Sequence, residues 1–116
     1  MQFVAIVYED PTAEPYDPAE DHIEDWVREG LERGIEVRGD RLRPVAETRT
    51  VRRADGGTLV TDGPFAEVTE LIAGYDVLEC ADLDEAIDFV SRHPMARFGA
   101  IELRPVWPLD LEADGR

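Results

Sequence analysis

Two amphipathic helices, each lying between two extended segments, constrain the fold of this chain more than any other feature of its sequence. The first helix is predicted to start at residues 17–20 (Asp-Pro-Ala-Glu), which supply an N-cap, a proline at the first helical position and an acid at the third. Residues 82–85 (Asp-Leu-Asp-Glu) repeat this cap-plus-acid pattern and open the second helix. The chain therefore contains two β-α-β units.

Each helix has one apolar stripe that predicts its buried face. The stripe of the first helix follows the i, i+3, i+4, i+7, i+8 spacing, and Gly34 ends that helix. The second helix stops before His93-Pro94. The stripes consist of Ile23, Trp26, Val27, Gly30 and Leu31 in the first helix and of Leu83, Ala86, Ile87 and Val90 in the second.

Extended segments flank both helices, and a hairpin is inserted between the two units. Asp55-Gly56 readily supplies the positive φ angles of a tight turn between two polar arms. Right-handed β-α-β units place both helices on one side of an antiparallel sheet, so the predicted fold is α+β and ferredoxin-like with an inserted β-hairpin. The predicted strands are residues 2–8, 35–39, 48–53, 58–61, about 70–80 and 100–104.

The first strand is apolar on both faces, which predicts a sheet that is covered on both faces. The helices cover one face. Val4, Ile6, Ile72 and Leu78 are expected to contribute to the uncovered face, with the choice of the face that carries the helices left open by the sequence, and a second copy of the chain is the economical cover. We therefore expect a homodimer.

The charge balance excludes one class of partner. The chain has 12 Arg and no Lys against 27 Asp plus Glu, a net charge of −15. Such a surface repels phosphate backbones, and no basic cluster is dense enough to reverse that field, so we expect no nucleic-acid partner.

We expect no membrane span, since no apolar run approaches the ~18 residues that one requires. The N-terminus has neither a basic region nor a small-residue cleavage site, which predicts a cytoplasmic location. The single cysteine, Cys80, cannot form an internal disulfide and is predicted to be a small buried apolar residue.

Several motifs together resemble those of the YCII-related family, in the branch named for its Asp-Gly-Pro-Phe (DGPF) motif. The resemblance covers residues 1–106 and leaves residues 107–116 as a tail, with Trp107 and Leu109 as candidate anchors. It implies a dimeric α+β barrel. Relatives include proteins encoded beside sigma factors and dehydrochlorinases of chloroaromatic breakdown. The motifs are residues 61–67 (Thr-Asp-Gly-Pro-Phe-Ala-Glu), Gly74-Tyr75, residues 82–86, His93-Pro94 and residues 102–106 (Glu-Leu-Arg-Pro-Val).

The resemblance also implies a catalytic pair, in which a histidine early in the first helix meets an aspartate before a proline after the second. His22 matches the first position, but His93 stands at the second, ahead of Pro94. Two imidazoles disfavour double protonation, whereas an aspartate would raise the basicity of its histidine partner. The nearest carboxylate that could replace the missing aspartate is Asp62, which lies beside the matching Gly63-Pro64.

Each of these three residues also has a simpler interpretation. His22 could be a boundary residue of the helix stripe, and His93 could place a cation at the C-terminal end of the second helix. Asp62 could be a turn residue that accepts backbone N–H groups. Two histidines without a third ligand do not make a metal site, so we expect neither a metal nor a cofactor.

Candidate substrate contacts have similar alternatives. Tyr8 and Tyr75 on neighbouring strands could line a pocket or fill the core. Arg97 or Arg104 could hold a substrate carboxylate or pair with one of the many acids. Phe65 of the DGPF motif is also predicted to contact substrate.

Two functions remain open. The first is a cofactor-free lyase or isomerase that acts on an aromatic-derived or lactone-like acid, with His22 as the base and Asp62 or His93 orienting it. The second is a non-catalytic small-molecule sensor or accessory protein linked to a sigma-factor pathway. We expect His22 to face the same cleft as the Asp62–Phe65 turn.

Overall fold

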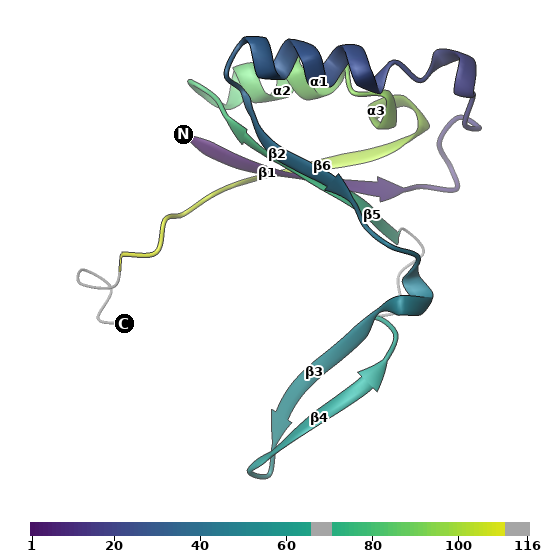
Figure 1. The fold of residues 1–116 in the computed structure, drawn as a ribbon, viewed down its shortest axis with the longest axis vertical. Coiled ribbons are helices and arrows are strands. Elements are labelled where there is room, and N and C mark those ends of the chain that lie inside the picture. The colour runs from purple at the N-terminus through teal and green to yellow at the C-terminus, as the bar shows by residue number, and fades with distance from the viewer. Residues whose placement is uncertain (66–70, 111–116) are drawn as a thin grey trace.

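The computed structural model describes residues 1–65 and 71–110. Its main sheet has four strands in the order β2-β5-β1-β6, and every neighbouring pair is antiparallel. Helices α1 and α2 lie on one face of this sheet (Figure 1). This order and connectivity confirm the predicted ferredoxin-like α+β fold. The elements are β1 (Gln2–Glu9), α1 (Ile23–Glu32), β2 (Glu36–Arg41), β5 (Leu71–Glu79), α2 (Leu83–Ser91) and β6 (Gly99–Pro105).

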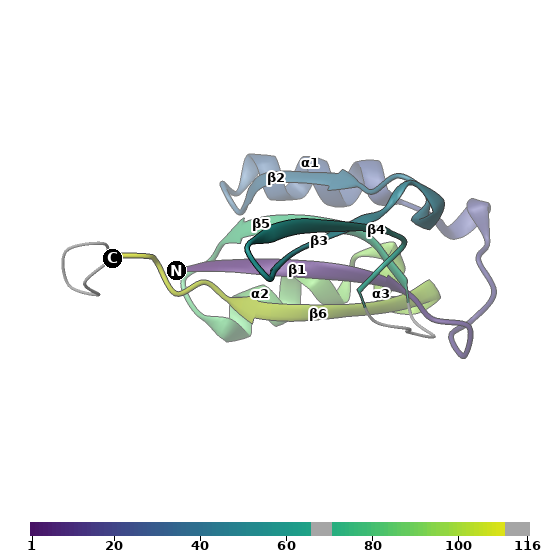
Figure 2. The same cartoon turned by 90° about the horizontal axis from the view of Figure 1, so that it is seen from below.

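The inserted hairpin leaves the body of the molecule as an arm made of β3 (Arg49–Ala54) and β4 (Gly57–Asp62). The predicted turn is confirmed, because Asp55 (φ 50°) and Gly56 (φ 74°) both have positive φ. The arm projects on the side of the sheet away from the helices, and in the view from below it lies in front of the sheet (Figures 1 and 2).

The predicted start of the first helix is wrong. Residues 18–20 form only a short 3-10 turn, in which the Asp17 carboxylate accepts a hydrogen bond from Ala19 N–H (3.0 Å). The backbone of Asp21 is then extended, and its carboxylate accepts from Ile23 N–H (3.2 Å) where α1 begins. This turn at Asp21 makes α1 begin at Ile23, later than the Asp-Pro signature indicates.

Two short helical segments were not predicted. One is a 3-10 turn, η2 (Val45–Glu47), and the other is α3 (Pro94–Phe98), which leads directly into β6. Pro94 occupies the first turn of α3 and His93 caps it. Pro94 follows the second helix, as predicted, but proline also favours the first position of a new helix.

The core lies between the sheet and the two helices. Trp26 of α1 stacks on Phe89 of α2 with ring centroids 4.3 Å apart, and its Nε1–H donates to the Phe89 carbonyl (2.8 Å). A Cβ on Gly30 would lie 2.7 Å from the Phe89 ring, so glycine permits the close approach of the helices. The buried core consists of Phe3, Ala5, Trp26, Ile35, Leu78, Cys80, Ala86, Phe89 and Val90.

Both predicted helix stripes are right at their centres and wrong at their edges. Leu31 in α1 and Leu83 and Ile87 in α2 are exposed. The stacking of Trp26 on Phe89 explains this, because it turns the Phe89 side of α2 toward α1. The predicted burial of Cys80 is confirmed.

The face of the sheet opposite the helices, here called the open face, differs from the predicted one. Val4 pairs with Val77 and Ile6 with Tyr75, and these side chains are half-buried. Leu78 instead pairs with Phe3, and both are completely buried beneath the helices. The predicted set therefore mixed two faces. The open face comprises Val4, Ile6, Ala73, Tyr75 and Val77.

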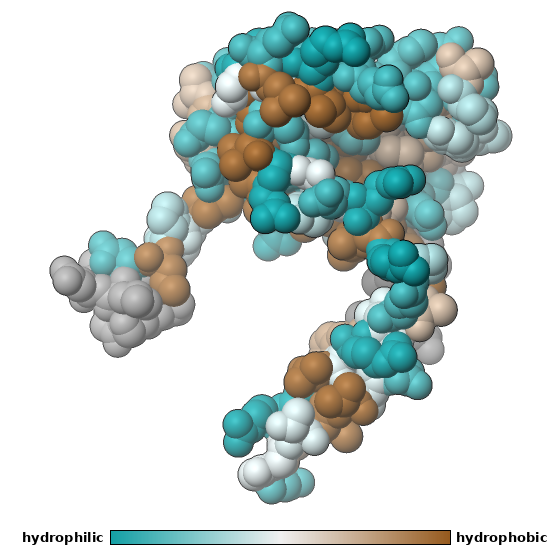
Figure 3. Space-filling model, in the orientation of Figure 1, coloured by the Kyte–Doolittle hydropathy of each residue, from teal (hydrophilic) through white to brown (hydrophobic). Residues whose placement is uncertain are grey.

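The segment after β6 leaves the body on the same side as the arm, and a wide hollow lies between them (Figures 1 and 3). Trp107 is 91% exposed and Leu109 is also exposed, so neither anchors the tail to the described part of its own chain. None of the described helices combines the length and apolarity needed to cross a bilayer.

Candidate functional site

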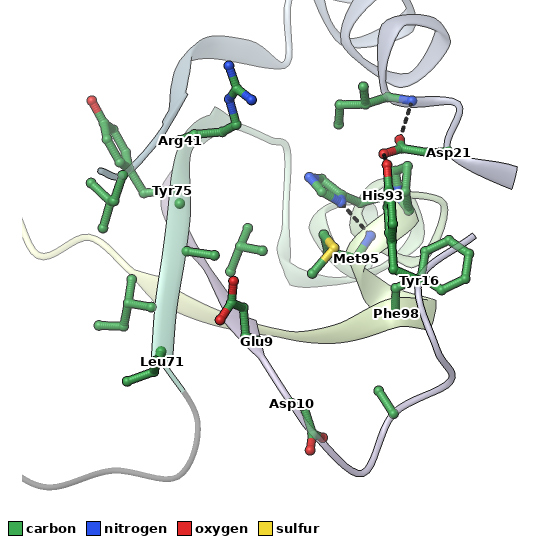
Figure 4. A pocket seen from close by; sticks show the side chains of 18 of the residues that line it. Glu9, Asp10, Tyr16, Asp21, Arg41, Leu71, Tyr75, His93, Met95 and Phe98 are labelled. Carbon is green, nitrogen blue, oxygen red and sulfur yellow. Dashed lines mark hydrogen bonds between the residues drawn. The ribbon is translucent and has the colours of Figure 1, made fainter. Parts of the chain in front are cut away.

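An open groove with a volume of about 1460 Å³ lies at the end of the sheet where β1 and β2 finish and β5 begins (Figure 4). Its walls come from the loop after β1, the start of α1, the segment that leads from β2 to the arm, and α3. Tyr16 and Phe98 meet edge to face at one wall, with ring centroids 5.4 Å apart. The groove thus combines aromatic and charged side chains.

His93 lies in the inner wall of the groove and is only 7% exposed. Its Nδ1 accepts a hydrogen bond from Met95 N–H (2.9 Å) and so caps α3. The neutral ring therefore carries its proton on Nε2. Burial lowers the pKa of His93 to about 4, although the charge of Asp21 opposes that shift. The predicted role of a cation at the end of α2 is wrong, because His93 is a neutral N-cap of α3.

Asp76 lies beside His93 in the same wall. Its Oδ2 is 4.0 Å from His93 Nε2, and Asp76 is only 8% exposed. Desolvation raises the pKa of Asp76. No hydrogen bond reaches His93 Nε2 from the part of the chain that the structure describes, so this N–H is available to a ligand in the groove.

A second carboxyl group backs Asp76. Glu36, the first residue of β2, faces Asp76, and desolvation together with the interaction between the two carboxyl groups raises the pKa of Glu36 to about 8. Both carboxyl groups fill the space over Gly39, where a Cβ would lie 1.9 Å from Asp76 Oδ1 and 2.8 Å from Glu36 Oε1. Gly39 therefore makes room for the pair.

Sequence reasoning missed Glu36 and Asp76. One signal could have found Asp76: it occupies the strand face that otherwise carries Gly74 and Leu78, and Leu78 is a core residue. A carboxylate on the buried face of a strand is costly unless it has partners, so it marks a candidate site.

Arg41 supplies a positive charge to the groove (Figure 4). Among residues 1–65 and 71–110 no carboxylate lies within ion-pair distance of its guanidinium. Arg43 also lines the groove, but it is paired with Glu47 (3.0 Å). Arg41 was not predicted as a site residue, and nothing in its exposed position on β2 distinguishes it in the sequence.

The structure does not bring His22 and Asp62 together. The side chain of His22 is 64% exposed beside a shallow depression before α1, 3.9 Å from the Glu20 carboxylate. The side chain of Asp62 is 90% exposed on the arm and pairs with Arg49 (3.1 Å). Neither residue lines the groove, so the expectation of one cleft shared by both does not hold within a single chain.

The two predicted tyrosines also separate. Tyr75 lines the groove, and its hydroxyl donates to the exposed Asp40 carboxylate (3.4 Å). Tyr8 is half-buried and lies outside the groove lining. Phe65 is exposed near the arm, where the Arg52 guanidinium lies 5.6 Å from its ring centroid.

Both arginines predicted to hold a carboxylate have carboxylate partners within the chain. Arg97 donates to Glu14 (2.6 Å), and Arg104 pairs with Glu102 on β6 (3.1 Å). Neither lines the groove. Within the described ranges no group of three or more His, Cys, Asp or Glu side chains is arranged to hold a metal ion.

Comparisons with known proteins agree with the motifs. An uncharacterized protein of Rhizobium meliloti (strain 1021) is 43% identical over 68 residues, which span 57% of this chain and 55% of that protein. The chain thus matches about half the length of this relative. The 5-chloro-2-hydroxyhydroquinone dehydrochlorinase of Burkholderia phenoliruptrix AC1100, in complex with 2,5-dihydroxybenzoquinone, covers 97% of this chain and 98% of its own, with 14% identity and a TM-score of 0.43.

A structural likeness with 14% identity and a TM-score of 0.43 supports no conclusion about the chemistry of this chain. The family comparison is much broader in extent, because the model of the YCII-related domain matches residues 1–110 of the 116. This match includes both β-α-β units, the arm and the residues that form the groove. The chain belongs to the YCII-related domain family.

Proposed function

We propose that this protein is a cofactor-free acid/base enzyme, a lyase or isomerase that acts on a small carboxylate-bearing molecule bound in the groove. One observation carries the proposal: His93 and Asp76 are both more than nine-tenths buried, yet both form part of the groove wall. Burying two titratable groups side by side is costly, and such groups cluster at sites of proton transfer.

The residues of the groove have complementary roles in this proposal. Arg41 binds the ligand carboxylate, since it is a groove cation without an ion pair in the described chain. The aromatic pair Tyr16 and Phe98 contacts a flat ring of the ligand. Nε2–H of His93 donates to a ligand carbonyl oxygen and stabilises the charge that develops there.

Asp76 exchanges the proton. Its Oδ2 accepts a proton from the carbon next to the ligand carbonyl, and the electron pair of the broken C–H bond moves into an enolate. In an isomerase, Asp76 returns the same proton at another carbon. In a lyase, the enolate electrons expel a leaving group and form a C=C bond, and the proton on Asp76 then passes to that group or to water.

The experiment measures solvent deuterium incorporation by NMR into two probes, 4-hydroxybenzoate as an aromatic acid and a butenolide acetic acid as a lactone acid. We expect both probes to bind, and the lactone acid to exchange its hydrogen next to the carbonyl. Asp76→Asn should reduce this exchange about 10²- to 10⁴-fold. His22→Gln is the matched control, because His22 lies outside the groove.

Wild-type exchange no faster than in buffer, with neither probe bound, would overturn the proposal. Loss of exchange in His22→Gln with full activity in Asp76→Asn would return the role of base to His22, as predicted from the sequence.

A second candidate is a non-catalytic small-molecule sensor or accessory protein in a sigma-factor pathway of the cytoplasm. It is favoured by the exposure of His22, whose side chain has Glu20, at 3.9 Å, as its ion-pair partner among the described residues and does not line the groove. Binding of the probes without deuterium exchange would support this candidate over the enzyme.

We also propose that the chain belongs to the DGPF branch and acts as a homodimer through the open face. The half-buried stripe of Val4, Ile6 and Val77 supports the dimer, because an isolated chain leaves it in contact with water. The arm supports it too. An isolated two-stranded hairpin is marginally stable, and Val51 and Val60 on this arm are paired with each other and exposed.

A further inference from the structure

Behind Asp76, which lines the groove, lies a second carboxyl group, that of Glu36. Asp76 faces His93 through Oδ2 and the space over Gly39 through Oδ1. Glu36 enters that same space through Oε1. Its Oε2 is completely buried and has no hydrogen-bond partner within the described residues.

Two ionised carboxylates cannot hydrogen-bond to each other, since both are acceptors only. Asp76 Oδ1 and Glu36 Oε1 both enter the space over Gly39, so a hydrogen bond between them there requires one proton. Glu36 is the better holder of it: its Oε2 lacks any donor that would stabilise a negative charge, whereas Asp76 has the imidazole N–H of His93 nearby.

We propose that Glu36 and Asp76 share one proton at neutral pH, and that neutral Glu36 is a positioning residue which holds Oδ1 of Asp76 so that Oδ2 faces the groove beside His93. The shared proton does not depend on catalysis. The effect of Glu36 on a ligand rests on the proposed function.

The surroundings of the pair favour a single negative charge. From β2, the charge of Asp40 acts on Asp76 and opposes further ionisation. His93, at the junction of α2 and α3, is neutral and adds no positive charge. The charge of Asp21, before α1, opposes the lowering of the pKa of His93. Helices α1 and α2 present Gly30 and the Phe89 ring to this region. No cation among the described residues is positioned to neutralise a second carboxylate.

This arrangement explains what the extra carboxyl group contributes. A lone buried Asp76 would have only His93, at 4.0 Å, to favour its ionised form. A hydrogen bond donated by neutral Glu36 stabilises the ionised form of Asp76 without adding a second charge. It also fixes the rotation of the Asp76 carboxylate. Desolvation raises the pKa of Glu36 to about 8, so the donor persists through neutral pH.

The test is a pH titration of the side-chain carboxyl carbons by ¹³C NMR on the full-length protein. We expect one glutamate signal to titrate near pH 8 instead of near the usual 4.5, and to disappear in Glu36→Gln. Glu102→Gln, on the exposed part of β6, is the control and should leave the signal near pH 8 in place. A Glu36 signal that titrates near 4.5 would overturn the shared proton.

A stability measurement gives an independent check. The folded state holds the Glu36 proton up to about pH 8, whereas the unfolded chain releases it near 4.5. The folded state therefore binds more protons in this window, and its stability falls as pH rises. Glu36→Gln keeps a neutral hydrogen-bond donor, so it should remove this fall and leave the fold intact.

Deuterium exchange into the lactone acid separates the two proposals. We expect Glu36→Gln to retain exchange, because the amide still donates to Asp76, and Glu36→Leu to lose it. Equal exchange by both variants would overturn the positioning role. If the pair titrates as expected but the wild type exchanges nothing, the proposed function fails while the shared proton stands.

Discussion

The indole of Trp26 stacks on the ring of Phe89 at an interplanar angle of 20°, and its Nε1–H donates to the carbonyl of the same residue. This contact joins α1 to α2 across the core. Trp26→Ala should lower the free energy of unfolding by about 3 to 5 kcal/mol, because it leaves a cavity and removes the indole donor from the Phe89 carbonyl, which keeps only the longer bond from Arg92 N–H (3.3 Å).

Urea denaturation measures this cost from the midpoint and slope of the transition. Trp107→Ala is a control within the chain, since Trp107 is 91% exposed. A midpoint for Trp26→Ala that matches the control would show that the stacking contributes little to stability.

The pKa of His93 predicts a loss of stability in acid. Burial lowers that pKa from 6.5 to about 4, so between these values the unfolded chain binds a proton that the folded state does not. The contribution of neutral His93 to the free energy of unfolding is fully present above pH 6.5 and is lost as pH falls toward 4. His93→Asn keeps an acceptor for the α3 cap and should flatten this dependence.

Thermal or urea unfolding across that pH range gives the result. Between about pH 4.5 and 6.5 the titration of Glu36 changes stability in the opposite direction. The quantity to compare is therefore the difference in unfolding free energy between His93→Asn and the wild type at each pH. A difference that does not change with pH would contradict the lowered pKa of His93.

Arg41 should control affinity for the ligand carboxylate. Arg41→Gln removes the groove cation that has no described ion pair, and we expect about 10-fold or greater loss of affinity for 4-hydroxybenzoate, the scale of a charged hydrogen bond. Arg43→Gln is the matched control, because Arg43 is already engaged by Glu47. Equal weakening by both variants in calorimetry would indicate a general charge effect instead of a specific contact.

Gly39 should not tolerate a side chain. Gly39→Ala places a Cβ 1.9 Å from Asp76 Oδ1, so either the strand or the carboxyl pair must shift, at a cost of about 1 to 3 kcal/mol. Gly57→Ala on β4 meets only a backbone oxygen at 3.8 Å and is the control. Equal unfolding midpoints for the two variants would show that the carboxyl pair has room to move.

The proposed homodimer can be tested on the open face. Val77→Asp places a charge in the apolar stripe and should convert the dimer to a monomer, as judged by light scattering. Leu31→Asp changes an exposed apolar residue in the helix layer and should leave the dimer intact. A wild-type protein that scatters as a monomer at micromolar concentration would remove the argument for a dimer.

Local signals in the sequence were enough to predict the two β-α-β units, the Asp55-Gly56 hairpin turn and the centres of both helix stripes. Each depends on residues close together in the chain: a cap, a turn or a helical repeat. The helix edges failed for a related reason, because the rotation of α2 depends on Phe89 meeting Trp26, 63 residues away in the chain.

Only the tertiary structure decided which carboxyl groups form the site. The strand register sets which face of β5 carries Asp76, and it places Gly39 of β2 opposite Asp76. Helix packing then brings His93 against the same spot. Glu36, Asp76 and His93 are far apart in sequence, and the cost of burying their charges, which distinguishes them from the many other acids of this chain, exists only once the sheet and helices enclose them.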